Sequence, residues 1–322
     1  MIKYILKRLL WMIPVILGVL FIVFTISYFT PGDPVVALLG SNYTQEAYDR
    51  KVIELGLDKP FVVQFISYVW GIVTRLDFGV SYSYGHLVGV EMSSRLGTTF
   101  TLGMLSVCVT ILLGIPFGLL SATKQYSLLD YGVTSLSMIF AAMPGYWLAL
   151  MCILLFALKL EWLPATGLGS WRHWVLPVLS NSLTSVAVVA RMTRSSMLEV
   201  IRQDYIRTAR AKGLKESKVI SRHALKNALI PVITIVGMQM SMVMGGSVII
   251  ETIFTIPGLG TYLMSGISAR DYPVINGCVL LLSLCICAMN LLVDVCYAYV
   301  DPRIKAQYES GKKRGQAKKE AA

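Results

Sequence analysis

Six apolar stretches, each of roughly 17 to 27 residues and almost free of charged side chains, dominate this sequence. A helix of about 20 such residues crosses a hydrocarbon layer about 30 Å thick, so each stretch is long enough to span a membrane. Hydrophobic residues make up 55% of the chain and charged residues 15%, which excludes an ordinary soluble protein. We therefore predict an all-α integral membrane protein with six transmembrane helices. The predicted spans are residues 9–29, 99–121, 132–158, 174–190, 228–254 and 274–300.

The distribution of positive charge predicts how the chain faces. An even number of spans puts both termini on one side of the membrane, and that side carries 21 of the 29 Lys and Arg residues, against 8 on the other. Because Lys and Arg concentrate in cytoplasmic loops, both termini are predicted to be cytoplasmic. The net charge of +11 is then explained by orientation in the membrane, and no nucleic-acid partner is expected.

The first span follows a basic start and so looks like a secretory signal. A cleaved signal has an apolar core of about 7 to 15 residues and a small-residue cleavage site, whereas this run is longer and leads into Thr30-Pro31-Gly32-Asp33-Pro34. We expect the span to be retained. The predicted organisation is N-terminus and first span 1–30, outward segment 31–98, five-helix core 99–300 with cytoplasmic segment 191–227, and basic cytoplasmic tail 301–322.

The sequence lacks the motifs that would make the chain an enzyme. It contains no Gly-x4-Gly-Lys-Ser/Thr phosphate loop, no His-Glu-x-x-His zinc motif and no Gly-x-Ser-x-Gly nucleophile motif. Its six cysteines all lie in predicted spans without a Cys-x-x-Cys pair, so neither disulfides nor zinc are expected. The chain itself is predicted to bind no metal or cofactor and to have no catalytic residue.

The outward segment 31–98 is too long for a simple loop and is predicted to be partly helical, at residues 45–55 and 61–72. The second of these helices carries Phe61, Phe65, Tyr68 and Trp70 with few charges, so it is expected on the membrane face or against other helices. Two interpretations remain open for the segment: a packed cap, or a docking surface for an external partner.

The cytoplasmic segment 191–227 predicts one short, well-bounded helix. Residues 193–203 continue the fourth span as a polar helix, Asp204 offers an N-cap carboxylate, and residues 205–212 form about two turns. Gly213 suits the left-handed position after the helix. Ile206, Ala209 and Gly213 form a narrow stripe of low profile rimmed by cations, which favours insertion into a groove on another protein. Contact of the ten basic residues with anionic lipid headgroups is the alternative.

Polar residues inside the fourth and fifth spans are candidates for a substrate path, because polar groups in hydrocarbon turn toward neighbouring helices or a wet cavity. Hydroxyl and amide groups would accept a peptide backbone, and Met would adapt to varied side chains. Helix packing is the alternative explanation. The candidate path residues are Asn181, Thr184, Ser185, Met238, Gln239, Met242 and Glu251.

Seven short motifs, in this order, give the sequence a recognisable pattern over nearly its whole length. They are Pro31-Gly32-Asp33-Pro34, Leu55-Gly56-Leu57-Asp58-Lys59-Pro60, Asp77-Phe78-Gly79, Arg191-Met192-Thr193-Arg194-Ser195-Ser196-Met197, Asp204-Tyr205-Ile206-Arg207-Thr208-Ala209-Arg210-Ala211-Lys212-Gly213, Pro257-Gly258-Leu259-Gly260 and Arg270-Asp271-Tyr272-Pro273-Val274-Ile275. The pattern resembles the integral membrane permease subunits of bacterial ATP-binding-cassette importers, in the dipeptide, oligopeptide and nickel family. Within it the chain looks like the B-type subunit, which carries the long first outward segment.

The resemblance implies the type I importer permease fold in the bacterial cytoplasmic membrane. It also implies that residues Asp204 to Gly213 form the coupling helix, which sits in a cleft of a cytoplasmic ATPase. The implied partners are a second, homologous permease subunit, two ATPase subunits that bind ATP and Mg²⁺, and an extracytoplasmic substrate-binding protein. In the general motif of these importers an acidic residue stands where this chain has Arg207, so a salt bridge made by that acid does not carry over to this chain.

The resemblance predicts an importer of di- or oligopeptides, with nickel, a metal–opine chelate or glutathione as alternative substrates. Two other classes of function are alternatives. An ion-coupled secondary transporter would need an internal repeat and charged residues near the membrane midplane, and the sequence shows no convincing repeat and few such charges. A membrane receptor or scaffold would not depend on ATPase partners.

Overall fold

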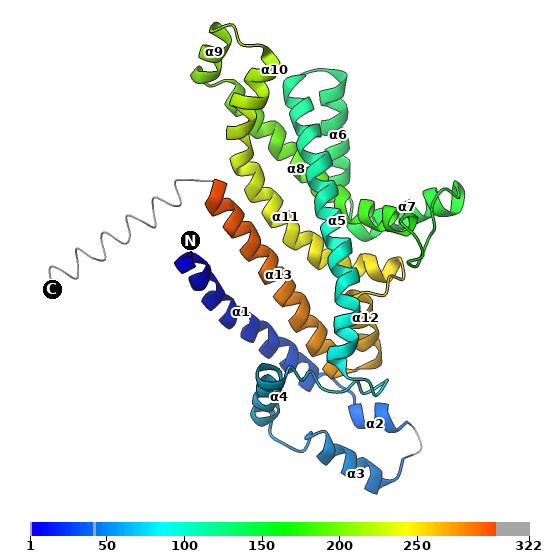
Figure 1. Ribbon diagram of the computed structural model, residues 1–322. Helices are drawn as coiled ribbons and strands as arrows, with labels where there is room; N and C mark the ends of the chain where they lie inside the picture. The colour runs from blue at the N-terminus through cyan, green and yellow to red at the C-terminus, as the bar shows by residue number, and fades with distance from the viewer. Residues whose placement is uncertain (1, 41–42, 301–322) are drawn as a thin grey trace, which may run out of the picture. The chain divides into compact units, whose positions relative to one another are not determined.

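The computed structural model describes residues 2–40 and 43–300, so the basic tail 301–322 lies outside the described residues. Within the described part the chain is almost entirely helical, and the sole β-pairing there is an isolated bridge between Val80 and Leu87 (Figure 1). The helices are α1 Ile2–Phe29, α2 Pro34–Leu39, α3 Gln45–Glu54, α4 Phe61–Arg75, α5 Val88–Thr123, α6 Leu128–Ala142, α7 Gly145–Cys152, α8 Arg172–Ile201, α9 Asp204–Ala211, α10 Glu216–Lys218, α11 Leu225–Ile253, α12 Leu259–Ala269 and α13 Tyr272–Val300. Two π-helical segments, Ile153–Lys159 and Val219–Ala224, continue α7 and precede α11.

Five of the predicted spans are helices long and apolar enough to cross a membrane. They belong to α1, α5, α8, α11 and α13. The sixth is the pair formed by α6 and α7, which is broken and bent between Ala142 and Gly145. The all-α fold class with up to six spans is thus confirmed, and the helices predicted at 45–55 and 61–72 are present as α3 and α4.

The structure interrupts the span predicted over 132–158, and Pro144 explains the break. The residue before a proline avoids the helical region, and Met143 has extended backbone angles of φ −86° and ψ 133°. The proline also offers no N–H to continue the ladder of hydrogen bonds. The chain therefore leaves the helix at Met143 and resumes it at Gly145 as a second helix.

The chain divides into two compact units, each of which receives parts of several helices. Unit 1 comprises residues 1–105, 145–181 and 244–287, and unit 2 comprises 106–144, 182–243 and the remainder from 288. In unit 1, α2, α3 and α4 follow the end of α1 (Figure 1). The α1–α4 contact is aromatic: Phe24 lies 5.7 Å from Phe61 and 5.4 Å from Phe65 between ring centroids. Aromatic pairs at these separations are stabilising beyond their buried area.

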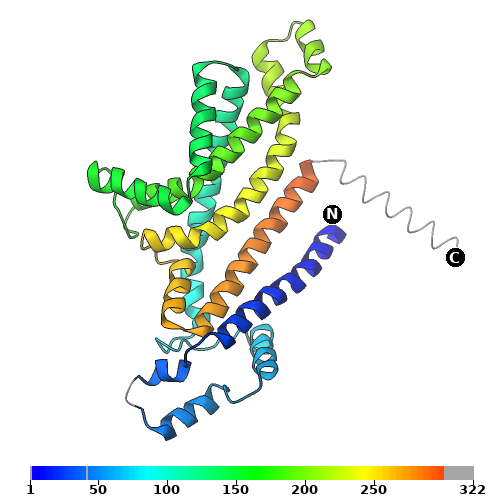
Figure 2. The ribbon, with the colours of Figure 1, turned by 180° about the vertical axis from the view of Figure 1, so that it is seen from behind.

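Unit 2 depends on close approach between α5 and α8. A Cβ atom on Gly114 would lie 2.8 Å from Val189 Cγ1, and one on Gly118 would collide with the backbone of Ala190. Glycine at both positions therefore allows the two helices to touch through their backbones, as small residues do in membrane helix packing. Figure 2 shows α9 and α10 of this unit between the end of α8 and the start of α11.

A partly buried ion pair joins α6 to α8 within unit 2. Asp130 is 2% exposed, and Arg194 donates to its Oδ1 from Nε at 2.7 Å and to its Oδ2 from Nη2 at 2.9 Å. The Ser121 hydroxyl donates to Oδ1 at 2.5 Å and the Tyr126 N–H donates to Oδ2 at 3.0 Å. The carboxylate is thus bidentate to Arg and saturated with donors, which is the condition under which a buried charge is tolerated.

We expect Asp130→Asn to destabilise the chain, because it leaves the Arg194 guanidinium without its counter-charge. Removing one partner of a fully buried pair costs about 3–5 kcal/mol, and the loss here is smaller because the Arg194 side chain is 27% exposed. The double variant Asp130→Leu/Arg194→Met should recover part of this loss, since it leaves no buried charge. Thermal unfolding of the purified chain measures all three proteins. A single variant as stable as the original chain would contradict the assignment.

Candidate functional site

The short cytoplasmic helix predicted from the sequence is present as α9, and it starts one residue earlier than predicted. Its N-cap is Gln203, with extended backbone angles and no side-chain cap, and Asp204 is the first helical residue. The prediction of Asp204 as N-cap is therefore wrong; its carboxylate lies in the first turn, where negative charge favours the positive end of the helix. Gly213 has φ +76°, so its predicted left-handed conformation is confirmed.

The apolar stripe of α9 faces the chain's own interior. Ile206 is fully buried and Ala209 is 7% exposed, whereas Gly213 is exposed. The prediction that this stripe enters a groove on another protein is thus wrong for its two apolar members. An apolar stripe predicts that one face of a helix is buried, but it does not predict which surface covers that face. The residues that bury it with Ile206 and Ala209 are Ala122, Met197, Val219, Ala224 and Ala228.

Two polar contacts fix α9 on this core. Asn227 Nδ2 donates to Tyr205 Oη at 2.8 Å, which ties the first turn to α11. Arg210 donates to Glu216 from Nε at 3.0 Å and from Nη2 at 2.6 Å, which closes the turn between α9 and α10. The hydrogen bond from Arg210 lowers the pKa of Glu216 below its ordinary value, so the carboxylate stays ionised at neutral pH. An isolated helix of eight residues is only marginally stable in water, and these contacts supply the additional stability.

The opposite face of α9 is open to solvent. Arg207 is 76% exposed in its side chain, and Tyr205 is 44% exposed. Arg207 has one weak ion pair, 3.7 Å from Asp204, which is itself 98% exposed in its side chain and adds little to stability. The outward face is thus mixed in charge and carries one aromatic ring. Its exposed members are Asp204, Tyr205, Arg207, Thr208, Arg210, Ala211, Lys212 and Gly213.

Five of the candidate path residues lie in unit 2, and the structure brings two of them together. Ser185 Oγ donates to Gln239 Oε1 at 3.3 Å, which joins α8 to α11. Thr184 Oγ1 instead donates to the Phe140 carbonyl on α6 at 3.4 Å. Met238 is 63% exposed and Met242 is 73% exposed in the isolated chain. The hydroxyls thus serve helix packing here, while the two Met side chains remain free for another contact.

The other two candidates, Asn181 and Glu251, lie in unit 1. Asn181 Oδ1 would lie 3.3 Å from a Cβ atom on Gly246, so it packs directly on α11. Glu251 is fully buried, and its Oε2 accepts from the N–H groups of Gly260 at 2.7 Å and Thr261 at 3.4 Å. This carboxylate caps the start of α12. It does not line a path in this structure, which corrects the expectation for Glu251.

The sequence interpretation did not identify the Asp130–Arg194 pair as a site. Arg194 belongs to one of the recognised motifs, but Asp130 is 64 positions away in the chain and no spacing rule connects them. The available signal was the acid itself, placed at the edge of an apolar run, where an ionisable residue needs a partner. Met197 and Ala122 of the α9 core lie close in sequence to Arg194 and Ser121, so the ion pair adjoins the support of α9.

Two family profiles match this chain over almost all of its length. The profile described as binding-protein-dependent transport system inner membrane component matches residues 114–306. The profile for the N-terminal part of membrane components of such systems matches residues 1–103.

Curated relatives match from end to end. A putative peptide transport system permease protein of Brucella abortus is 41% identical over 309 residues, covering 94% of this chain and 98% of the relative. The oligopeptide transport system permease protein AppB of Bacillus subtilis is 38% identical over 316 residues, covering 95% and 100%. The dipeptide transport system permease protein DppB of Escherichia coli is 37% identical over 337 residues, covering 95% and 99%.

Solved structures agree on the fold. A structure titled as an inward-facing conformation of the MetNI methionine ABC transporter has a TM-score of 0.57 and 19% identity, covering 66% of this chain and 97% of that chain. At this identity the likeness concerns the fold alone. The helices and these matches together define an integral membrane permease component of a transport system. More specifically, the chain belongs to the binding-protein-dependent transport system inner membrane component family.

We expect Ile206→Ala to loosen α9 from its core, because removing a buried Ile side chain leaves a cavity and costs about 2–5 kcal/mol. Amide hydrogen exchange in residues 204–228 should become faster. Thr208→Ala is the matched control, because Thr208 is exposed and such changes cost less than about 0.5 kcal/mol. Equal exchange in the two variants would show that Ile206 does not hold the helix.

Proposed function

We propose that this chain is the transmembrane permease subunit of an ATP-driven importer that moves di- or oligopeptides into the bacterial cytoplasm. The observation that carries the proposal is the full-length match to relatives named as peptide, oligopeptide and dipeptide transport permease proteins. The family description, a binding-protein-dependent transport system, speaks against an ion-coupled secondary transporter and against a receptor or scaffold. The absence of a phosphate-loop motif from the sequence supports ATP hydrolysis on separate subunits.

The proposed assembly contains a second, homologous permease subunit, two ATPase subunits that bind ATP and Mg²⁺, and an extracytoplasmic substrate-binding protein. Both termini and α9 face the cytoplasm in this proposal, which rests on the excess of Lys and Arg in the segments on that side. Residues 31–98 then lie outside, where the binding protein delivers its peptide. The permease spans the bilayer between them.

In the proposed mechanism α9 is the coupling helix, and its solvent face contacts the ATPase. Its buried face rests on Met197 of α8 and Ala228 of α11, so displacement of α9 moves the ends of both spans. ATP-driven closure of the ATPase pair would push on Tyr205, Arg207 and Thr208 and tilt the helix ends. Such a push changes the equilibrium between inward-facing and outward-facing states only if the contact differs between them.

The proposed substrate path runs along α8 and α11. Ser185 and Gln239 already pair across the two helices, and a peptide backbone offers the same donors and acceptors as that pair. Met238 and Met242 expose flexible, polarisable side chains that adapt to different peptide side chains. Asn181 and Thr184 are further candidates on α8.

Reconstitution of the complete complex with its binding protein tests the function. We expect di- or tripeptides to stimulate ATP hydrolysis and to accumulate inside proteoliposomes. Nickel chelates, metal–opine chelates and glutathione, presented in the same way, serve as comparison substrates and should give no stimulation. Stimulation by one of these and not by peptides would replace the peptide assignment.

Cysteine crosslinking tests the coupling role of α9. We expect Thr208→Cys and Ala211→Cys, both on the exposed face, to crosslink to an ATPase subunit in the assembled complex. Glu46→Cys is the matched control, because it is also exposed but lies in the outward segment and should meet no ATPase subunit. If the exposed cysteines never capture an ATPase subunit in an assembly that hydrolyses ATP, α9 is not the coupling helix.

A further inference from the structure

Helix α4 carries no charged residue from 61 to 74, and Lys59 and Arg75 flank this run. Its 15 residues are too few to span a membrane, which takes about 20. Apolar side chains on a helix need cover, from protein or from lipid. The three sides of α4 differ in what covers them.

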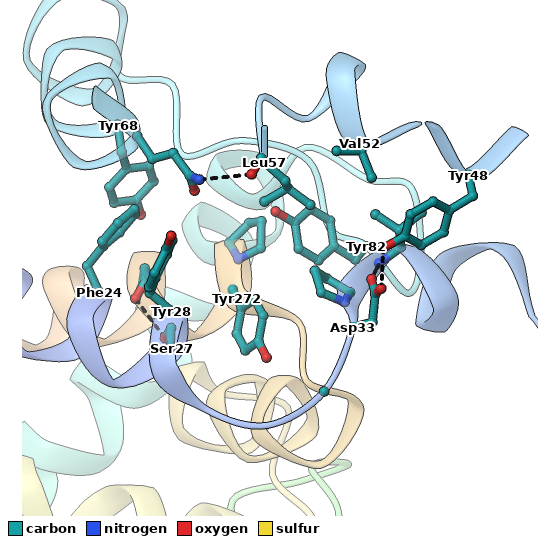
Figure 3. Close-up of a pocket in the computed structure, with 16 residues that line it drawn as sticks. Phe24, Ser27, Tyr28, Asp33, Tyr48, Val52, Leu57, Tyr68, Tyr82 and Tyr272 are labelled. Carbon is teal, nitrogen blue, oxygen red and sulfur yellow. Dashed lines mark hydrogen bonds between the residues drawn. The ribbon is translucent and has the colours of Figure 1, made fainter. Parts of the chain in front are cut away.

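One side of α4 packs on the end of α1 (Figures 1 and 2). The ring of Phe65 lies 5.4 Å from that of Phe21 and 5.4 Å from that of Phe24, between centroids. Phe61 lies 6.0 Å from Phe21. Tyr68 lies 5.8 Å from Phe24, and Figure 3 shows these two rings together. Aromatic pairs at such separations are stabilising, so they hold α4 on α1.

A second side of α4 is polar. It carries Gln64, Ser67 and Thr74, which share this side because they stand at positions i, i+3 and i+10 of the helix. Gln64 Nε2 donates to the Lys59 carbonyl at 2.8 Å, and Ser67 and Thr74 are exposed. The residues of α4 that line the pocket of about 350 Å³ in Figure 3 are Gln64 and Tyr68. The polar side thus faces the pocket and solvent.

The third side of α4 is apolar and has little cover from the part of the chain that the structure describes. Five large apolar side chains there are between 44% and 72% exposed. They belong to Val62, Val63, Ile66, Trp70 and Val73. A contiguous apolar surface of this kind marks contact with a partner or with a membrane. Phe21 of α1, which touches α4, is also 47% exposed, so the uncovered surface continues onto a helix long and apolar enough to span the membrane.

The level at which α4 meets α1 lies inside the membrane. The apolar span of α1, Ile5–Phe29, has 25 residues and is about 37 Å long at about 1.5 Å per residue. The hydrocarbon layer is about 30 Å thick, so about 7 Å of the span can lie beyond it. Phe21 stands about 12 Å before the end of the span. Even if all the excess length lies at this end, Phe21 is about 5 Å inside the hydrocarbon.

We propose that α4 lies in the membrane, in the leaflet where α1 ends, with its uncovered apolar side against phospholipid acyl chains. The side that carries Gln64 faces water. In the proposed orientation of the chain this is the outer leaflet. The apolar side of α4 is then a membrane contact, and it is not a docking surface for an external protein. The inference needs α1 to span the membrane and does not depend on what the complex transports.

The residues at the ends of α4 fit this placement. Helices that lie in the plane of a membrane insert their apolar face about 5–10 Å below the headgroups, which matches the depth of Phe21. Trp70 has an apolar ring and one N–H donor, and such side chains concentrate where headgroups meet acyl chains. Lys59 and Arg75 have long side chains that reach from the helix ends to the headgroups. The inserted helix would fix the outward segment at the membrane surface.

Photo-crosslinking in the complete complex, embedded in phospholipid nanodiscs, tests the proposal. The photoreactive residue p-benzoylphenylalanine replaces Ile66 or Val73, and on irradiation it inserts into a neighbouring C–H bond. Replacement of Ile53 on α3 is the matched control, because Ile53 is also apolar and 67% exposed but lies in water in this proposal. We expect phospholipid adducts at 66 and 73, detected by mass spectrometry, in about fivefold higher yield than at 53, because acyl chains surround only an inserted helix.

Equal lipid yields at the three positions would overturn the proposal. Adducts with protein at 66 and 73 would also overturn it, and an adduct with the binding protein would make this side of α4 a docking surface. A lack of any adduct at 66 and 73 would place that side in water, which again contradicts insertion. Peptide uptake is measured separately on the same complex. Lipid adducts without peptide uptake would leave the placement of α4 intact and count against the transport function alone.

The fluorescence of Trp70 gives a second measurement. The emission that Trp70→Phe removes from the complex is the signal of Trp70. We expect phospholipids brominated on their acyl chains to lower this signal about twofold, because the indole lies at the level of those chains, whereas iodide in the water should lower it little. Quenching by iodide and not by brominated lipid would refute insertion, even if the crosslinking variants fail to assemble.

Discussion

A polypeptide inside hydrocarbon must satisfy its backbone hydrogen bonds within itself, and the architecture of this chain follows from that requirement. Long helices meet this requirement through their own backbone hydrogen bonds. The helices are interrupted where other groups supply the missing hydrogen-bond partners. At Met143–Pro144 the proline has no N–H to satisfy. Beyond α11, the start of α12 receives acceptors from two other helices: Glu251 Oε2 accepts from the Gly260 N–H, and Thr99 Oγ1 accepts from the Leu259 N–H at 2.8 Å. At the start of α12, side chains thus supply partners for the backbone groups that the break frees, and near Met143–Pro144 the Phe140 carbonyl accepts from Thr184 Oγ1.

The same requirement applies to charged side chains. Asp130 is tolerated in its buried position because Arg194, Ser121 and Tyr126 together satisfy its carboxylate. Ser121 and Arg194 lie within three residues of Ala122 and Met197 in the chain, so this cluster adjoins the residues that support α9. A helix of eight residues can then act as a rigid element, although it would be unstable alone.

Features that depend on local chemistry were predictable from the sequence, and features that depend on distant partners were not. Apolar length alone identified five spans, and a lone glycine identified the left-handed turn at 213. The N-cap was misplaced because Asp is favoured both at the cap and in the first turn, so Asp204 fits either position. The stripe of Ile206 and Ala209 predicted burial correctly but not its partner. Glu251 carried the same ambiguity, since a polar group in a span serves a helix end as readily as a substrate.

The two faces of α9 are held by different contacts, so substitutions on them have different effects. The inner face packs against Met197, Val219 and Ala228, so substitutions in this core lower the stability of the fold. On the outer side, Tyr205 and Arg210 hold the helix through Asn227 and Glu216, whereas Arg207 has only a weak ion pair with Asp204, so Arg207 can vary with little loss of stability. In the proposed assembly, changes at Arg207 or Lys212 would alter the contact with the ATPase while the residues that support α9 stay constant. Compatibility with the ATPase would then change independently of the fold.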